Sequence, residues 1–410
     1  MSTERLRHRN VAMRFKLEST EGVDANPGAE DAFPFEVEGY DYNGPFRTEN
    51  SQEANGSLAA SAPLIIGQPA EVSIRVRMKG AGAGTSYSPT VKPPHHALLS
   101  ACGWRGLFTA AIAAASLSAG TVSAATLDTT FSDTAQSYRG LPLQLAGGPS
   151  NGQIAHVIDY TAGREASLSD LFDSALTNAV TAALPANWSY APTSPADTTE
   201  RTADQPSGTL YIYEDGVLRR FTGLRGMVDF QGETARPGFM SFRFTGTYSG
   251  KSDVSRPSDS VPQHSAPTLA MGSGGVTPSL VVDRKQLAIR NWALRTGQAL
   301  EVSDDPNTDF GFGAGDLAGR QQMLTLDPND TLVANRDVIS DIENGVQYSA
   351  VVRCGVVAGN RWSLLLPRLQ PADPTPGQRG IFRTEELSLY AINQGRGPSL
   401  RDSDAVLTFY

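Results

Sequence analysis

The chain has 410 residues, enough to bury a large apolar core without disulfides or structural metals. Lys and Arg total 34 against 43 Asp and Glu, a formal net charge of −9, which argues against a protein that neutralises a nucleic-acid backbone over a broad surface. The 40 glycines and 26 prolines, with only 19% charged residues, favour a turn-rich, mainly β protein over a helical bundle.

The N-terminal part of the chain predicts an arm followed by strands. The first ten residues, MSTERLRHRN, are basic and polar, so we expect residues 1–20 to form an extended arm. Strand-like runs follow at 33–42 and 71–80, and in the second of these Val72, Ile74, Val76 and Met78 alternate with polar residues. A first domain is predicted to comprise residues 21–104 and 207–279.

The stretch KPPHHALLSACGW, residues 92–104, invites a chemical interpretation, since it holds His95, His96 and Cys102. Adjacent histidines on a helix diverge, and no further ligand pair has zinc spacing, so a metal site is disfavoured. Apolar neighbours raise the pKa of a thiol, so Cys102 is not expected to be a nucleophile. We predict instead a short helix begun by Pro93–Pro94, with Leu98, Leu99 and Cys102 buried and Gly103 ending it.

Residues 105–206 are predicted to be an α/β insert. Its start, within 104–126, imitates an export signal but lies a hundred residues into the chain, so a buried or subunit-contacting segment is the preferred interpretation. In 167–184, Leu168, Leu171, Phe172 and Leu176 recur at helical spacing after Ser167, which predicts a helix. The Pro- and Ser-rich stretches 187–207 and 249–279 predict exposed loops or connections.

The second half of the chain contains a predicted meander and a possible repeat. Residues 208–248 predict consecutive strands with turns at Asp215–Gly216 and Pro237–Gly238 and a break at Gly226. The windows 238–248 and 380–390 both run from a turn glycine to a tyrosine, and a strand at 321–326 precedes a helix candidate at 329–345. Residues 280–410 are therefore either a second copy of the domain or the second half of one fold, and turn punctuation alone could produce the similarity.

No motif indicates catalysis. The run GAGAGT at 80–85 lacks the ending of a phosphate-binding loop, and nucleophile-elbow and zinc-helix motifs are missing. The acidic run 301–309 lacks calcium-loop spacing, and His156 in the insert has no evident nucleophile or metal partner. We therefore predict no enzyme, no catalytic, cofactor-binding or metal-binding residues, and no cofactor.

Three stretches resemble the major tail tube proteins of long-tailed bacteriophages. They are RFKLESTEGVDANPGAEDAFPFEVEGYDY near the start, VSIRVRMKGAGAG with PPHHALLSACGW, and YIYEDGVLRRFTGLRGMVDFQGETARPGFMSFRFTGTY. Their order also matches, and the resemblance covers residues 12–104 and 207–410. Trp104 stands where the family usually has Phe, and the insert stands where the family has a short connection.

The resemblance implies a β-sandwich or barrel-like tube fold and a structural virion protein of the phage tail, made in the host cytoplasm. It implies rings of three chains with pseudo-sixfold symmetry, if the domain is duplicated, or of six chains, stacked into a conduit for the genome. Tail terminator, tape measure and distal tail proteins would be partners, DNA would pass without specific binding, and no membrane contact is expected. From the net charge we expect acidic residues to outnumber basic ones on the wall of the bore.

The alternative is a receptor- or carbohydrate-binding β-sandwich of the virion. Such a protein needs clustered exposed aromatic residues, whereas Trp104, Trp188, Trp292 and Trp362 are scattered along the chain and are predicted to be core residues. The alternative is therefore less favoured than the tube.

Overall fold

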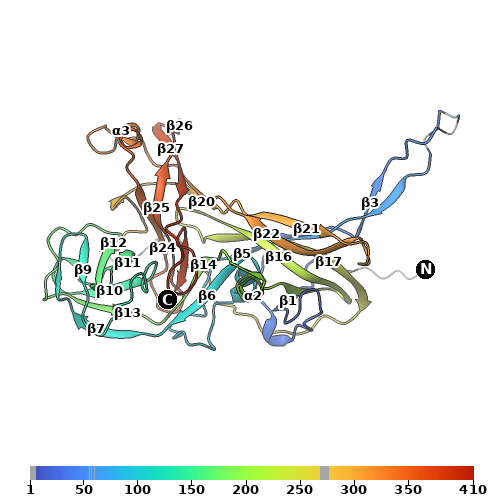
Figure 1. Cartoon of the computed structure of the whole chain (residues 1–410), viewed down its shortest axis with the longest axis horizontal. Helices are drawn as coiled ribbons and strands as arrows, with labels where there is room; N and C mark the ends of the chain where they lie inside the picture. Colours follow the sequence, from blue (N-terminus) through green and yellow to red (C-terminus); the bar gives the residue numbers. More distant parts are fainter. Residues whose placement is uncertain (1–5, 55, 57, 60, 268–276) are drawn as a thin grey trace.

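The structure, a computed structural model, describes residues 6–410 except 55, 57, 60 and 268–276, and it confirms the mainly β prediction (Figure 1). Within these residues, a 17-stranded sheet curls like half a barrel, and a 7-stranded sheet lies at one end of the molecule. No helix of the described chain is long and apolar enough to cross a bilayer.

The first part of the large sheet, here called the first module, is an antiparallel series built mainly around the alternating strand at 70–77. In that strand Val72, Ile74 and Val76 are buried, while Arg75 and Arg77 lie on the opposite face. The strands pair in the order β1 (Val11–Leu17), β15 (Gly208–Glu214), β16 (Val217–Glu233), β17 (Phe239–Asp253), β5 (Ala70–Arg77) and β2 (Tyr40–Tyr42).

The second module repeats this antiparallel pairing order with later strands. They are β18 (Leu280–Val282), β24 (Tyr348–Cys354), β25 (Trp362–Pro371), β27 (Phe382–Ala391), β23 (Met323–Leu326) and β20 (Asn291–Arg295). Each module also has one short helix at the same place in chain order, α1 (His96–Ala101) and α3 (Val338–Glu343). Gly103 and Gly345 follow these helices at the same distance with φ of 71° and 66°.

Each module also sends out a hairpin between its last two strands in the pairing order. In the first module the hairpin is β3 (Phe46–Glu49) with β4 (Leu64–Gly67), and in the second it is β21 (Ala299–Asp304) with β22 (Phe312–Gly319). The first hairpin projects far from the body, whereas the second lies along the sheet (Figure 1). Strand β26 (Thr375–Arg379) continues β25 beyond a short break and pairs with β27.

The predicted repeat is therefore present at the level of elements, but the predicted register is wrong by three residues. The buried residues of β17 are Met240, Phe242 and Phe244, whereas those of β27 include Leu387 and Leu389. Aligning Gly238 with Gly380 sets buried Phe244 against exposed Glu386. Aligning Phe242 with Leu387 instead restores the inside and outside faces of both strands, since side chains alternate with a period of two.

Residues 112–184 form the second sheet, with a core of its own. Its strands are β7 (Ile112–Ser116), β8 (Ala119–Gly120), β9 (Ala124–Thr126), β10 (Pro142–Ala146), β11 (Ile154–Tyr160), β12 (Glu165–Leu168) and β13 (Thr181–Leu184). The helix predicted at 167–184 is wrong. Leu168, Phe172, Leu176 and Val180 are buried at four-residue spacing, but the chain between β12 and β13 is a loop over this core, and Leu171 is exposed.

The boundaries of the insert also differ from the prediction. Strands β6 (Trp104–Thr109) and β14 (Asn187–Pro192) pair with each other inside the large sheet, and β14 also pairs with β28 (Val406–Phe409). Residues 187–192 are buried rather than a loop. The helix of this region is α2 (Thr198–Asp204), and the Asp197 side chain accepts a hydrogen bond from the Glu200 amide at its start.

The predicted N-terminal arm, residues 1–20, is wrong for residues 11–17, which form β1. Strand β1 pairs with β15 along its whole length, and its residues Val11, Met13 and Phe15 are buried in the core. Their apolar alternation favours a strand in spite of the polar residues that precede it. Residues 1–5 lie outside the described chain. In the predicted meander, β16 runs through Gly226, and its pairing with β17 is irregular between Arg220 and Phe221 and between Thr222 and Arg225 instead.

A buried arginine joins the second sheet to the second module. Arg353 on β24 is 0% exposed and donates hydrogen bonds to the Asp170 carboxylate, to Ser169 Oγ (2.8 Å) and to His156 Nδ1 (3.1 Å). It also reaches the Pro278 carbonyl at 2.9 Å. The insert is therefore held by a buried ionic contact rather than by its chain connections alone.

Candidate functional site: the open sheet face and two strand edges

The stretch 92–104 folds as predicted, into a short helix whose histidines serve structure. Leu98, Leu99 and Cys102 are buried, and the helix ends before Gly103. His95 Nε2 lies 3.0 Å from the Arg77 carbonyl, while His96 Nδ1 lies 2.9 Å from the Tyr190 hydroxyl. The two rings thus turn to different partners, and burial raises the pKa of the Cys102 thiol.

Burial makes the fold sensitive to mild acid at these histidines. It lowers the pKa of His95 to about 3 and that of His96 to about 4, against about 6.5 in an unfolded chain. Below about pH 6.5 these histidines therefore bind protons in the unfolded state but not in the folded state, so the free energy of unfolding decreases as the pH falls. Between pH 6.5 and pH 5, we expect His95→Gln to lose about 2 kcal/mol less unfolding free energy than the wild type.

Urea unfolding at the two pH values measures this difference. His8→Gln, at an exposed position, is the control and should behave as the wild type. Equal losses in the wild type and in His95→Gln would show that His95 does not carry the effect.

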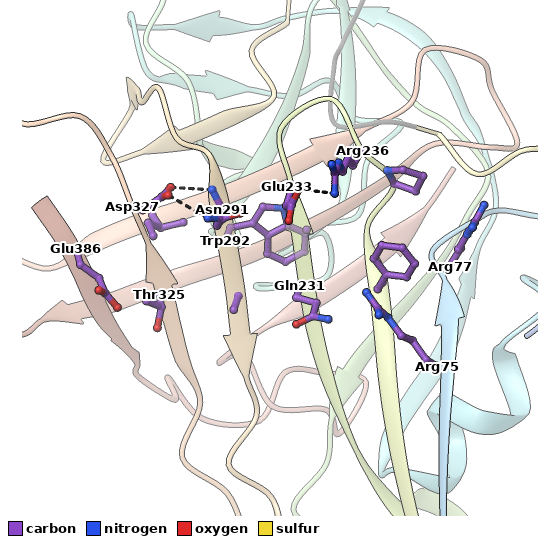
Figure 2. Close-up of a pocket in the computed structure, with 15 residues that line it drawn as sticks. Arg75, Arg77, Gln231, Glu233, Arg236, Asn291, Trp292, Thr325, Asp327 and Glu386 are labelled. Carbon is purple, nitrogen blue, oxygen red and sulfur yellow. Dashed lines mark hydrogen bonds and ion pairs between the residues drawn. The ribbon is translucent and has the colours of Figure 1, made fainter. Parts of the chain in front are cut away.

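The face of the large sheet opposite its core, here called the open face, carries polar and charged side chains from strands of both modules. A cleft of about 700 Å³ crosses it at the junction of the modules (Figure 2). Arg75 and Arg77 lie at one end of the cleft and Asp327 and Glu386 at the other, with Glu233 between them. Arg243 and Arg295 on neighbouring strands and Glu71 on β5 are also exposed, so the face carries charged side chains of both signs.

The two modules meet in a strand joint within the chain. Strand β16 pairs antiparallel with β20 from Phe230↔Leu294 to Glu233↔Asn291. Gly232 faces Trp292 in this joint, and a Cβ at position 232 would lie 2.6 Å from the indole Nε1, so the joint requires glycine there. The joint makes the two modules one continuous sheet.

The hairpin β21–β22 covers one end of the first module. Its Leu317 lies against Gly103, and its Gly315 lies so close to Thr245 that a Cβ would be 2.8 Å from the Thr245 carbonyl oxygen. Beneath the hairpin, Arg225 on β16 is buried and donates to the Gly315 carbonyl (2.9 Å) and to the carboxylates of Glu21 and Asp316 (2.6 and 3.3 Å). The hairpin of the second module thus locks onto the first.

Two strand edges lie at opposite ends of the joined sheet. Among the described residues, β2 pairs only with β5, and β26 pairs only with β27. The backbone groups of Gly39 and Asn43 form hydrogen bonds with β5. Because successive residues of a strand direct their backbone groups to opposite sides, those of Tyr40 and Tyr42 face outward. Pro376 lies in β26, as is typical of edge strands, because proline has no amide hydrogen to donate. Unpaired edges of this kind template association with another chain.

The other predicted residues are placed without a catalytic arrangement. His156 accepts from Arg353 and is buried against Tyr410, and burial lowers its pKa well below the usual value. Within the described ranges, no group of three or more His, Cys, Asp and Glu side chains could hold a metal ion. Trp104, Trp188, Trp292 and Trp362 are all buried, as predicted.

No family model matches the chain, and no curated protein matches it significantly. The resemblance to tail tube proteins therefore rests on the quoted stretches alone. The strand edges were missed from the sequence, although the proline in TPGQRGIFR, residues 375–383, is a signal of an edge strand.

Proposed function

We propose that this protein is a structural virion component whose copies join through strand edges into rings that stack as a phage tail tube, the conduit for the genome. The observation that carries the proposal is the repeated pairing order, with one joint inside the chain and two matching edges left at its ends. Strand β2 occupies the same place in the first module as β20 does in the second. Strand β26 follows β25 along the same line and corresponds to the C-terminal part of β16, which is the part that pairs with β20.

The internal joint specifies the register of the proposed external one. With Phe242 equivalent to Leu387, Gly232 corresponds to Gln378 and Trp292 to Tyr40. The pair Gly232↔Trp292 then predicts Tyr40 of one copy opposite Gln378 of the next, and Asp41 opposite Gly377. The outward backbone of Tyr40 could exchange both ladder hydrogen bonds with that of Gln378, whereas Pro376 could only accept one from the Tyr42 amide, because proline has no amide hydrogen.

Because each chain carries two modules, three chains would close a ring with pseudo-sixfold symmetry. Joints between an edge of one copy and a different edge of the next are heterologous, and such contacts close into rings when the rotation allows. The open face would line the bore. With its mixed arginines and carboxylates, this wall would be less acidic than the net charge leads one to expect, and opposed charges spread over one surface offer no continuous basic track for DNA.

A disulfide across the proposed joint tests it. In Asp41→Cys/Gly377→Cys the two Cα atoms of neighbouring copies would lie about 4.5 Å apart, within reach of a disulfide. Mild oxidation of the assembled protein should give a non-reducing gel ladder that ends at three chains, while electron micrographs show rings or tubes. The native Cys102 and Cys354 are buried and should not contribute.

The single variants Asp41→Cys and Gly377→Cys are the controls and should give no ladder. A ladder that continues to six chains would contradict the two-module ring. Persistent monomers at high concentration would contradict assembly altogether, and binding of glycans or a receptor by such monomers would favour the alternative of a binding β-sandwich.

A further inference from the structure

The hairpin β3–β4 is a projection whose strands carry exposed apolar side chains. Leu64, Ile65 and Phe46 expose 53%, 73% and 57% of their surface. At the base, Phe46 packs edge-on against Phe310 of the second hairpin at 5.4 Å. Beyond this contact, strands β3 and β4 extend away from the body of the molecule (Figure 1). Apolar side chains held out on an ordered hairpin are typical of an association surface.

The second hairpin shows what such a hairpin covers. It leaves its module between β20 and β23 and lies on the module that β20 joins, with Leu317 over Gly103 and with Arg225 and Thr245 beneath. The first hairpin leaves its module at the equivalent place, between β2 and β5. When β5 and β23 are aligned in the register that makes Phe242 equivalent to Leu387, Ile65 corresponds to Leu317 and Gly67 corresponds to Gly319.

The second module keeps the corresponding surface uncovered. Gly345 ends α3 as Gly103 ends α1, but Gly345 and the following Val346 are exposed, whereas Gly103 is buried under the hairpin. By the same register, Gln370 and Tyr390 correspond to Arg225 and Thr245. Tyr390 is 38% exposed on the open face, and Gln370 is half-buried.

We infer that hairpin β3–β4 of one copy lies across the second module of the next copy, with Ile65 over Gly345 and Val346 and with Gln370 and Tyr390 beneath. The inference rests on the proposed ring, because the β2–β26 joint brings the two surfaces together. The occupant of the exposed surface is thus a second copy of this chain. Each joint would consist of a paired strand edge and a covering hairpin, as the joint inside the chain does.

A charged substitution on the hairpin tests this contact. Ile65→Glu changes a side chain that is solvent-exposed in the single chain, so thermal unfolding of the monomer should be unchanged. Burying an unpaired carboxylate at the contact is unfavourable, so self-association measured by sedimentation should weaken at least tenfold. Leu171→Glu makes the same kind of change at an exposed position of the insert and should assemble as the wild type.

A second disulfide separates the hairpin contact from the ring itself. Ile65→Cys/Val346→Cys should link neighbouring copies on oxidation, and each single variant should not. If Asp41→Cys/Gly377→Cys gives its ladder but Ile65→Cys/Val346→Cys gives none and Ile65→Glu assembles normally, the ring is right and the hairpin contact is wrong. If neither pair forms and the wild type stays monomeric, both proposals are overturned.

Discussion

Replacing Arg353 by leucine is expected to lower the free energy of unfolding by about 3–5 kcal/mol, the usual cost of removing one partner from a buried ion pair. The guanidinium is fully buried between the second sheet and β24, and its loss leaves the Asp170 carboxylate without its cation. Ser169 Oγ and His156 Nδ1 lose a donor at the same time. Urea unfolding followed by tryptophan fluorescence measures the change.

Two further variants locate the cause. Arg353→Leu/Asp170→Asn leaves no buried charge, so it should recover part of the lost stability. Arg368→Leu removes an exposed arginine from the neighbouring strand β25 and should change stability by less than about 0.5 kcal/mol. A loss in Arg353→Leu no greater than in Arg368→Leu would show that the buried contact does not hold the insert.

Replacing Arg225 by leucine is expected to cost about 2–3 kcal/mol and to release hairpin β21–β22 from the first module. Arg225 is buried, but Glu21 and Asp316 are about half exposed and can be rehydrated, so the cost should be smaller than at Arg353. The Gly315 carbonyl loses its bond to the arginine as well. Limited proteolysis should then cut the loop between β21 and β22 faster than in the wild type.

The matched variant is Arg243→Leu, at an exposed arginine on the adjacent strand β17. It should leave both stability and the cleavage rate unchanged. Faster cleavage in both variants would indicate a general effect of losing charge on this sheet rather than the loss of a specific lock.

The sequence predicted those features whose causes are local. The helix at 96–101 follows from two prolines, an apolar face and a terminal glycine within one short stretch, and β5 follows from strict alternation. The helix at 167–184 failed because burial every fourth residue suits a loop wrapped over a small core as well as it suits a helix. The β16–β20 joint pairs residues about sixty positions apart, and nothing local marks Gly232 and Trp292 as neighbours.

The repeat lies between these cases. The order of elements was visible from turn glycines and tyrosines, but aligning these residues sets the register of the strands three residues off. A shift by an odd number of residues places every side chain on the opposite face of the sheet. The pairing of Phe242 with Ile74 and of Leu387 with Leu326 decides it. The burial of Arg353 could not be predicted from the sequence. A charged residue in VVRCGVV is expected to be exposed unless its partners, which lie in the insert, are known.

The joint inside the chain has a kinetic consequence for assembly. Two modules linked covalently and already paired through β16 and β20 meet without diffusing, so half of the joints of the proposed ring exist before any two molecules collide. Nucleation of a ring would then require three molecules to meet, whereas a ring built from single modules would require six. Such a protein could begin to polymerise at a lower concentration, which favours early completion of each tube over the accumulation of many partial rings.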